Sequence, residues 1–152
     1  MTLSDKNISG SLIDGNVAKL FELASAFRRA IMQCDPKSLC ITLQDFPNGA
    51  CGDASLLLAK YFENNEYGKF DYVLGQRGGK SHAWLQQGNL IADITADQFE
   101  DQDRTIMVTT DHSWHREFSG EVQNVADFEI YDSHTVSVLR NNFRQIESKI
   151  CT

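Results

Sequence analysis

Three residues of the chain carry side chains that together could perform acyl transfer: Cys51, His82 and Asp93. A thiol acts as a nucleophile in its thiolate form, and a neighbouring imidazole can take the thiol proton. A carboxylate beside that imidazole fixes its orientation and tautomer. This chemistry requires that the fold bring the three side chains together.

The segment 81–95 predicts a β-hairpin that carries the histidine and the aspartate. Gly88-Asn89 is a plausible two-residue turn, and with it Gln87 pairs with Leu90. One face is then wholly apolar, and the other carries His82, Trp84, Gln86, Ile91, Asp93 and Thr95. A shift of one residue would mix these sets, so the alternation favours this register. Asp93 then lies diagonal to His82, with about 7–8 Å between backbones, a gap that the side chains can bridge. A purely structural His–Asp pair is equally compatible with this pattern.

The sequence around Cys51 predicts a thiol at the start of a helix. A turn-rich passage, 45–49, precedes the cysteine, and apolar residues at helical spacing follow it as far as Phe62. The exposed N–H groups of a helix start favour a thiolate and can hold an oxyanion, while Gly52 permits close approach of the backbone. Gln44 is a candidate side-chain donor to that oxyanion. A lone cysteine is otherwise a small buried hydrophobe, as we expect for Cys34.

The elements that position these residues follow from periodicity. We expect a helix over 16–33, capped by Asp14 or Asn16 and ending before Pro36, with residues 1–12 loose. Further helices are predicted over 51–62 and 136–150. Strands are predicted over 70–75, 81–86, 90–95, 105–109 and 128–131, with a flexible glycine-containing loop at 75–80. The plan is α+β, with residues 1–152 forming a single domain.

These motifs resemble the Cys-His-Asp superfamily of transglutaminase-like proteins, arylamine N-acetyltransferases and papain-type proteases. Residues 46–51, running into a helix, look like the nucleophile turn of that group. His82-Ala83-Trp84 and Asp93-Ile94-Thr95 look like its histidine strand and its Asp-x-Thr strand, in the same chain order. The resemblance covers about a third of the chain, Gln44 to Phe99. It implies a papain-like core of near minimal size, in which the nucleophile helix packs on an antiparallel sheet.

The resemblance has departures. Cys51 is followed by Gly52-Asp53 and not by an aromatic residue, and no calcium-loop signature is present. The implied catalytic residues are Cys51, His82 and Asp93, while Gln44 and Trp84 are expected to contact the oxyanion or the substrate. No cofactor and no metal are expected.

Composition limits the partners. Hydrophobic residues make up 41% and charged residues 23% of the chain, the mix of a globular protein. The formal net charge is -7 without a basic stripe, which argues against nucleic acid or an anionic membrane surface. The acidic stretch 97–103 is interpreted as a solvated loop. No signal peptide or membrane-spanning run is apparent, so we expect a reducing cytoplasmic location and free thiols.

A second group of histidines offers an alternative chemistry. His112 and His115 have HxxH spacing with Asp111 beside them, but no further zinc motif accompanies them. A loop with two exposed histidines is the favoured interpretation, and Trp114 is a candidate for lining a substrate cleft. The glycines of the 75–80 loop lack a nucleotide-binding pattern.

Three functional hypotheses follow. The first is an enzyme that forms an acyl-thioester on Cys51 from a peptide, a protein side-chain amide or a small amide, and so works as a hydrolase, deamidase or amine transferase. The second is a non-catalytic binding module on the same scaffold. The third is a metal-dependent protein that uses Cys51, His82, His112 or His115.

Overall fold

The chain forms an α+β fold in which three helices and five strands are arranged around one main core. The computed structural model describes the backbone of residues 3–150 and the side chains of residues 16–150. The helices are α1 (Leu3–Gln33), α2 (Cys51–Asn64) and α3 (Ser133–Ser148). The strands are β1 (Asp71–Arg77), β2 (Lys80–Gln87), β3 (Leu90–Asp93), β4 (Met107–Thr109) and β5 (Glu121–Val125). Five short 3-10 helices, η1 (Pro36–Ser38), η2 (Ile41–Leu43), η3 (Ala96–Gln98), η4 (His115–Phe118) and η5 (Phe128–Ile130), connect them.

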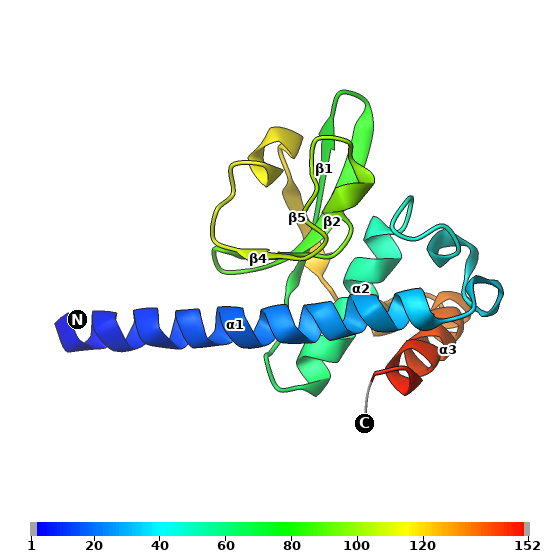
Figure 1. Cartoon of the computed structure of the whole chain (residues 1–152), viewed down its shortest axis with the longest axis horizontal. Coiled ribbons are helices and arrows are strands. Elements are labelled where there is room, and N and C mark those ends of the chain that lie inside the picture. The colour runs from blue at the N-terminus through cyan, green and yellow to red at the C-terminus, as the bar shows by residue number, and fades with distance from the viewer. Residues whose placement is uncertain (1–2, 151–152) are drawn as a thin grey trace.

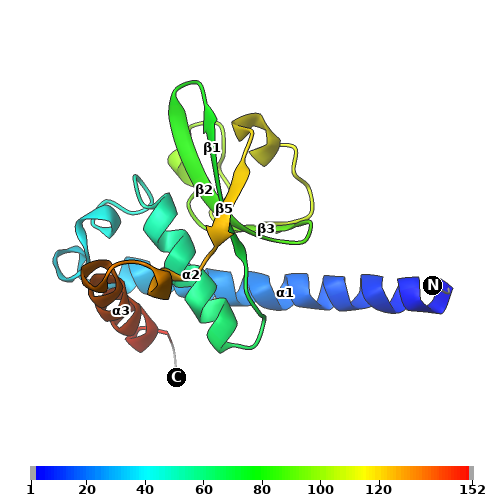
Figure 2. The ribbon, with the colours of Figure 1, turned by 180° about the vertical axis from the view of Figure 1, so that it is seen from behind.

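The sheet is antiparallel throughout, in the order β4-β3-β2-β1-β5. It stands on one side of the molecule, and α1 runs beneath it past α2 and α3 (Figure 1). The view from behind shows the same separation of the sheet from the three helices (Figure 2). Helix α2 packs against β2, and α1 packs against α2, α3 and β4. The start of α2 therefore lies beside the strand that carries His82.

Two hydrophobic clusters lie on opposite faces of the sheet hairpin. The larger joins the helices to one face of the sheet and includes Phe27, Phe62 and Leu85, each fully buried. The smaller contains Val73, Trp84, Ile91, Phe99 and Phe118. The alternation predicted for 81–95 is thus realised, with Leu85 and Trp84 on different sides.

The observed hairpin register is the predicted one. Gln87 pairs with Leu90, and Leu85 pairs with Ala92. Gly88 has a φ of 60°, which allows the two-residue turn. Helix α2 begins at Cys51, as its apolar spacing predicts, and α3 covers most of the predicted terminal helix.

The first helix is longer than predicted. It begins at Leu3, so the expectations that residues 1–12 are loose and that Asp14 or Asn16 caps the helix are wrong for the described residues. Gly10 and Gly15 each cost a helix about 1 kcal/mol relative to Ala, but no proline interrupts the stretch, and propagation from an established helix is easier than nucleation.

Two other local predictions are wrong, and a third holds in part. Residues 128–130 form η5 and not a strand, while β5 was not predicted. The 75–80 segment is not a flexible loop, because β1 continues to Arg77 and Gly78-Gly79, both with positive φ, make a tight turn into β2. The acidic stretch 97–103 has three exposed carboxylates, as predicted, but Asp97 is half-buried and pairs with Arg28.

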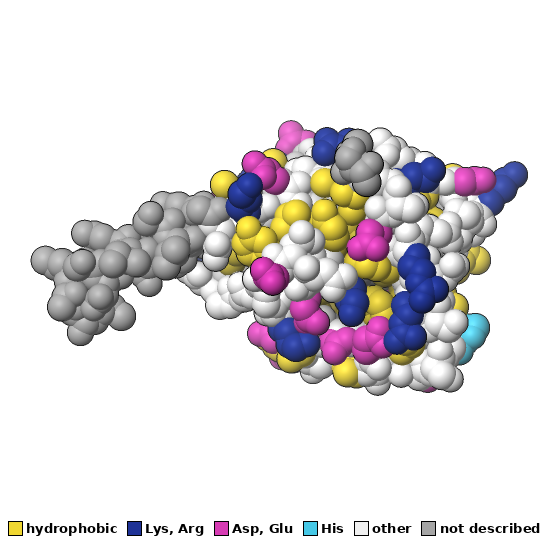
Figure 3. All heavy atoms as spheres, turned by 90° about the horizontal axis from the view of Figure 1, so that it is seen from below, with side chains coloured by type: hydrophobic (Ala, Val, Ile, Leu, Met, Phe, Trp, Pro, Cys, Tyr) yellow, Lys and Arg dark blue, Asp and Glu magenta, His cyan; other side chains and the backbone are white. Residues whose placement is uncertain are grey.

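The surface mixes charge with apolar groups. The face seen from below carries hydrophobic side chains among interspersed acidic and basic ones (Figure 3). Among the described residues, no helix is long and apolar enough to cross a membrane.

Gly75 permits the close contact that holds the 118–120 segment against the sheet. A Cβ atom at this position would lie 2.4 Å from the backbone oxygen of Phe118. We therefore expect Gly75→Ala to lower the free energy of unfolding by about 2 kcal/mol, the scale of overpacking in a fixed backbone. Urea unfolding measures the change. The neighbouring exposed variant Gln76→Ala is the control, and an equal stability of the two variants would contradict the contact.

Candidate functional site

Cys51 lies at the beginning of α2, where the sequence places it. Gly49 adopts a φ of +68° and Ala50 forms the helix N-cap, so Cys51 is the first helical residue. The cap makes no side-chain hydrogen bond, and the first N–H groups of a helix have no intrahelical acceptors. Cys51 is half-buried and a free thiol. Its surroundings therefore favour a negative charge on sulfur.

The close approach at this helix start depends on Gly52. A Cβ at Gly52 would lie 3.1 Å from the Tyr72 hydroxyl of β1. Burial, together with the negative charge of Cys51, raises the pKa of Tyr72 to about 12. A protonated tyrosine hydroxyl thus stands near the start of α2, a neighbour that sequence reasoning did not identify.

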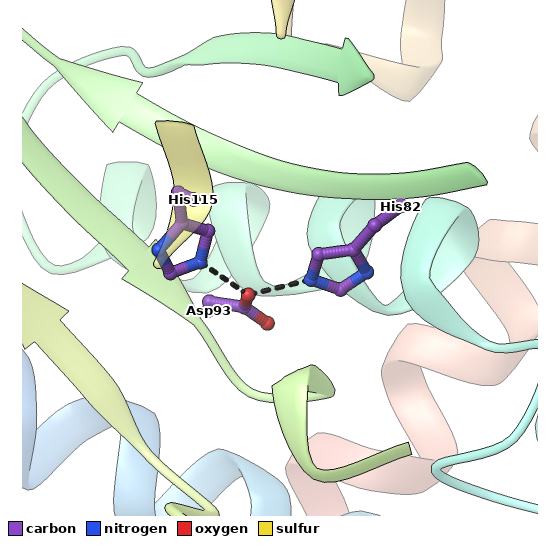
Figure 4. Close-up of side chains that lie close together, drawn as sticks. All are labelled: His82, Asp93 and His115. Carbon is purple, nitrogen blue, oxygen red and sulfur yellow. Dashed lines mark hydrogen bonds and ion pairs between the residues drawn. The ribbon is translucent and has the colours of Figure 1, made fainter. Parts of the chain in front are cut away.

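His82 and Asp93 meet as the hairpin register predicts. His82 comes from β2 and Asp93 from the end of β3. Nε2 of His82 donates a hydrogen bond to Oδ2 of Asp93 at 2.6 Å (Figure 4). Both side chains are buried. Because Nε2 faces Asp93, the Nδ1 atom of His82 is left to face the thiol of Cys51.

Gln98, which sequence reasoning missed, joins the histidine to the turn before Cys51. Its Nε2 atom lies 3.3 Å from Nδ1 of His82, and its Oε1 atom accepts a hydrogen bond from the Gly49 amide at 3.4 Å. Gln98 belongs to η3, the turn that follows the Asp93 strand. Its short distance along the chain from Asp93 is the only sequence signal that could have suggested this placement.

The position of Gln98 is fixed by its neighbour. Asp97 makes a bidentate ion pair with Arg28 of α1, at 2.7 and 2.8 Å. Arg28 also donates to the Ile94 carbonyl at 2.6 Å and lies over the ring of Phe46. The buried guanidinium thereby ties α1, the chain after β3 and the loop before Cys51 to one another.

Asp93 holds a second histidine. His115 of η4 donates from Nε2 to the same Oδ2 atom at 2.7 Å, and the Thr95 amide donates to Oδ1 at 2.9 Å. The interpretation of His112 and His115 as two exposed histidines is therefore wrong. His115 is 1% exposed, while His112 is half-buried and contacts the Asn89 carbonyl. Nothing in the local sequence could reveal this contact, because it spans 22 positions.

The geometry of this cluster fits hydrogen bonds better than a preformed metal site. His82, Asp93 and His115 are the only group of this kind among the described side chains. Ligand atoms of a tetrahedral zinc site, each about 2.0–2.2 Å from the metal, stand about 3.3 Å apart. The nitrogen–oxygen distances here are 2.6 and 2.7 Å. Of the four residues predicted as possible metal ligands, His82 and His115 belong to this group, whereas Cys51 and His112 do not.

Electrostatics favour a thiolate–imidazolium pair. Burial raises the pKa of the Cys51 thiol, but the hydrogen bond and charge of His82, with hydrogen bonds from the Ala83 amide and Gln98, outweigh it and hold this pKa below its ordinary value. Burial lowers the pKa of His82, but the charge and hydrogen bond of Asp93, with those of Cys51, raise it to about 9. Both shifts act in the same sense, because each stabilises the charged form of its group, and together they favour a thiolate beside an imidazolium.

Asp93 remains ionised despite its burial. Burial would raise the pKa of its carboxyl, but the charge of His82 and the hydrogen bonds from His115 and His82 hold it well below the usual range. The carboxylate can therefore balance the imidazolium across the whole physiological pH range.

The predicted substrate-contact residues occupy different environments. Trp84 is 3% exposed and packs against His82 and His115, with ring centroids 5.7 and 4.9 Å away, so it supports the histidines from within the sheet. Trp114 is half-buried with its ring centroid 5.7 Å from that of His82, and its predicted place in a substrate cleft stays a prediction. Gln44 is exposed, and its amide donates to the Leu39 carbonyl at 3.0 Å. Its predicted oxyanion contact stays a prediction.

The other cysteines lie apart from this chemistry. Cys34 is buried in the main core, as predicted, and Cys40 is half-buried near Thr42. Cys151 lies outside the described residues. Cys34, Cys40 and Cys51 are free thiols.

Comparisons of this chain with protein-family models, with curated proteins and with solved structures gave no match. The arguments for function therefore rest on the geometry of the site.

The pH dependence of alkylation tests the thiolate–imidazolium pair. We expect Cys51 to react with iodoacetamide at a lower pH than Cys40, because His82 stabilises its thiolate. In His82→Ala the half-maximal reactivity of Cys51 should move about 1–3 pH units higher. Mass spectrometry of each cysteine-containing peptide measures the rates separately. An unchanged Cys51 profile in His82→Ala would contradict the pair, and His112→Ala is the matched control.

The buried carboxylate predicts an acid-dependent contribution to stability. A depressed carboxyl pKa stabilises the fold above the unfolded value, about 3.9, and this contribution is lost as the pH falls through the folded value. Asp93→Asn should lower the free energy of unfolding at pH 7 by about 3 kcal/mol, since two histidines lose their ionised partner. Urea unfolding at several pH values should show the wild-type advantage shrinking as pH falls from 5 toward about 2. A difference independent of pH would contradict this account.

Proposed function

We propose that the protein is a thiol-dependent acyl-transfer enzyme that forms a thioester on Cys51. The observation that carries the proposal is the arrangement of a helix-start thiol, a buried histidine and a buried carboxylate, with Nε2 of the histidine bound to Asp93, so that Nδ1 is the nitrogen available to Cys51. This division is the one that a general base needs, because the nitrogen facing the nucleophile must exchange protons while the other is held.

A papain-like core is the finer fold proposal. Its support is the packing of α2 against β2, with Cys51 at the helix start and His82 and Asp93 on adjacent antiparallel strands. The order of the three residues along the chain agrees with the resemblance. The α+β class holds independently of this proposal.

The reaction follows from the placement of the groups. The Cys51 thiolate attacks the carbonyl carbon of an amide, a carbon–sulfur bond forms, and the carbonyl electrons move to oxygen. The tetrahedral intermediate collapses, the carbon–nitrogen bond breaks, and the leaving amine takes the proton from Nδ1 of His82. Asp93 keeps Nε2 protonated and fixes the ring throughout.

The second half of the reaction returns the enzyme to its starting state. Water, or an acceptor amine, gives a proton to Nδ1 of His82 as it attacks the thioester carbonyl. The carbon–sulfur bond then breaks, and Cys51 leaves as the thiolate beside the imidazolium. Hydrolysis, deamidation and amine transfer share these steps: the first two use water and differ in the amide that is cleaved, whereas the third uses an amine as the acceptor. We propose a peptide, a protein side-chain amide or a small amide as the acyl donor.

An activated ester tests for the acyl-enzyme. With p-nitrophenyl acetate we expect a burst of p-nitrophenolate close to one equivalent of enzyme, because acylation of a stabilised thiolate is fast and thioester hydrolysis is slower. Mass spectrometry should find the acetyl group on the Cys51 peptide. A primary amine added in excess distinguishes transfer from hydrolysis by the product formed.

Two variants make this test specific. Cys51→Ala should abolish the burst, while Cys40→Ala should retain it, since the side-chain partner of Cys40 among the described residues is Thr42 and not a histidine. An acetyl group found equally on Cys40, or no burst from the wild type, would reject the proposal. The second outcome would favour a binding module that keeps the scaffold without the chemistry.

A further inference from the structure

Gln98 is held as a hydrogen-bond donor beside the nucleophile by a backbone group of the nucleophile's own turn. Its Oε1 faces the Gly49 N–H, which can only donate, so the oxygen must be the atom on that side. The amide nitrogen is therefore the atom that faces His82 and Cys51. A flipped amide would set two N–H donors against each other at Gly49.

The protonation state of His82 decides where that nitrogen donates. When His82 is neutral, its Nδ1 lone pair can accept from Gln98 at 3.3 Å. When His82 is the imidazolium, Nδ1 carries a proton and is itself a donor. The Cys51 thiolate, whose pKa the Gln98 side chain helps to lower, is then the acceptor that we assign to the Gln98 amide.

We propose that the Gln98 side-chain amide donates a hydrogen bond to the oxyanion formed when Cys51 attacks a carbonyl. This role rests on the proposed acyl-transfer function. As the carbon–sulfur bond forms, the negative charge moves from sulfur to the adjacent carbonyl oxygen. A hydrogen-bond donor that already lies beside the sulfur needs only a short movement to donate to that oxygen. The N–H groups at the start of α2 supply the other donors.

The contacts that hold Gln98 in place suit the role of an oxyanion donor. An oxyanion donor is effective when it is fixed before the reaction. Asp97 is held by Arg28, and the Gln98 oxygen is held by Gly49, so both the backbone and the side chain are anchored. Gln44, the glutamine that the sequence favoured, is exposed and donates to Leu39.

The test compares two reactions of the same thiolate. Alkylation by iodoacetamide forms no oxyanion, whereas acetylation by p-nitrophenyl acetate does, and its leaving group departs as an anion that needs no proton from His82. In Gln98→Met, which keeps the side-chain length and removes the donor, we expect acetylation of Cys51 to slow about 10- to 100-fold. Alkylation should change less than about threefold at a pH where the thiolate is fully formed. Gln123→Ala, at an exposed glutamine of β5, is the control and should change neither rate.

Each outcome distinguishes the two proposals. Normal acetylation in Gln98→Met, with a burst in the wild type, rejects Gln98 as an oxyanion donor and leaves the acyl-enzyme standing. Equal losses in both reactions also reject it, since they indicate a displaced nucleophile. Normal acetylation in Gln98→Met together with slowed acetylation in Gln44→Ala would assign the role to Gln44 instead. No burst in the wild type rejects the proposed function and the role of Gln98 with it.

Discussion

The buried carboxylate of Asp93 is the constraint around which the site is built. An unpaired ionised carboxylate inside a protein is prohibitively costly, so its oxygens must be satisfied by donors that arrive from elsewhere in the fold. His82, His115 and the Thr95 amide supply them, from β2, η4 and the chain just after β3. The hairpin register and the packing of η4 on the sheet are both needed for that result. Stability and chemistry therefore draw on the same contacts.

A second buried charge positions the other side of the site. Arg28 lies in α1, far along the sequence from the hairpin, yet it binds Asp97 and the Ile94 carbonyl and covers Phe46. These contacts fix two segments of the site: the loop before Cys51 and the chain after β3. Because Arg28 is desolvated, its bidentate ion pair sets a geometry that a mobile surface pair could not. Helix α1 thus influences the site without contributing a residue to the chemistry.

The sequence predicts those parts of the site that depend on local patterns. Alternation over 81–95 specifies the faces of the hairpin, and so the meeting of His82 with Asp93, while helical spacing after Cys51 specifies where α2 begins. The contacts of His115 and Gln98 with the site are not predicted, because they depend on how η3 and η4 pack against the sheet. The strand β5 is missed for a similar reason: most of its side chains are exposed, so no apolar alternation marks it. Contacts between residues far apart in the chain produce no local pattern by which a single sequence would reveal them.

Two histidines share one carboxylate oxygen, and their other nitrogens decide which of them can serve the thiol. An imidazolium needs acceptors for both of its protons. Nδ1 of His82 faces Cys51, whereas Nδ1 of His115 is buried with no partner among the described residues and points away from Asp93 (Figure 4). A proton there would be a buried donor without an acceptor, a costly arrangement. His115 is therefore best placed to donate from Nε2 and hold Asp93 in position. In the proposed reaction this asymmetry favours proton exchange on the Cys51 side of His82, where the added proton has a partner.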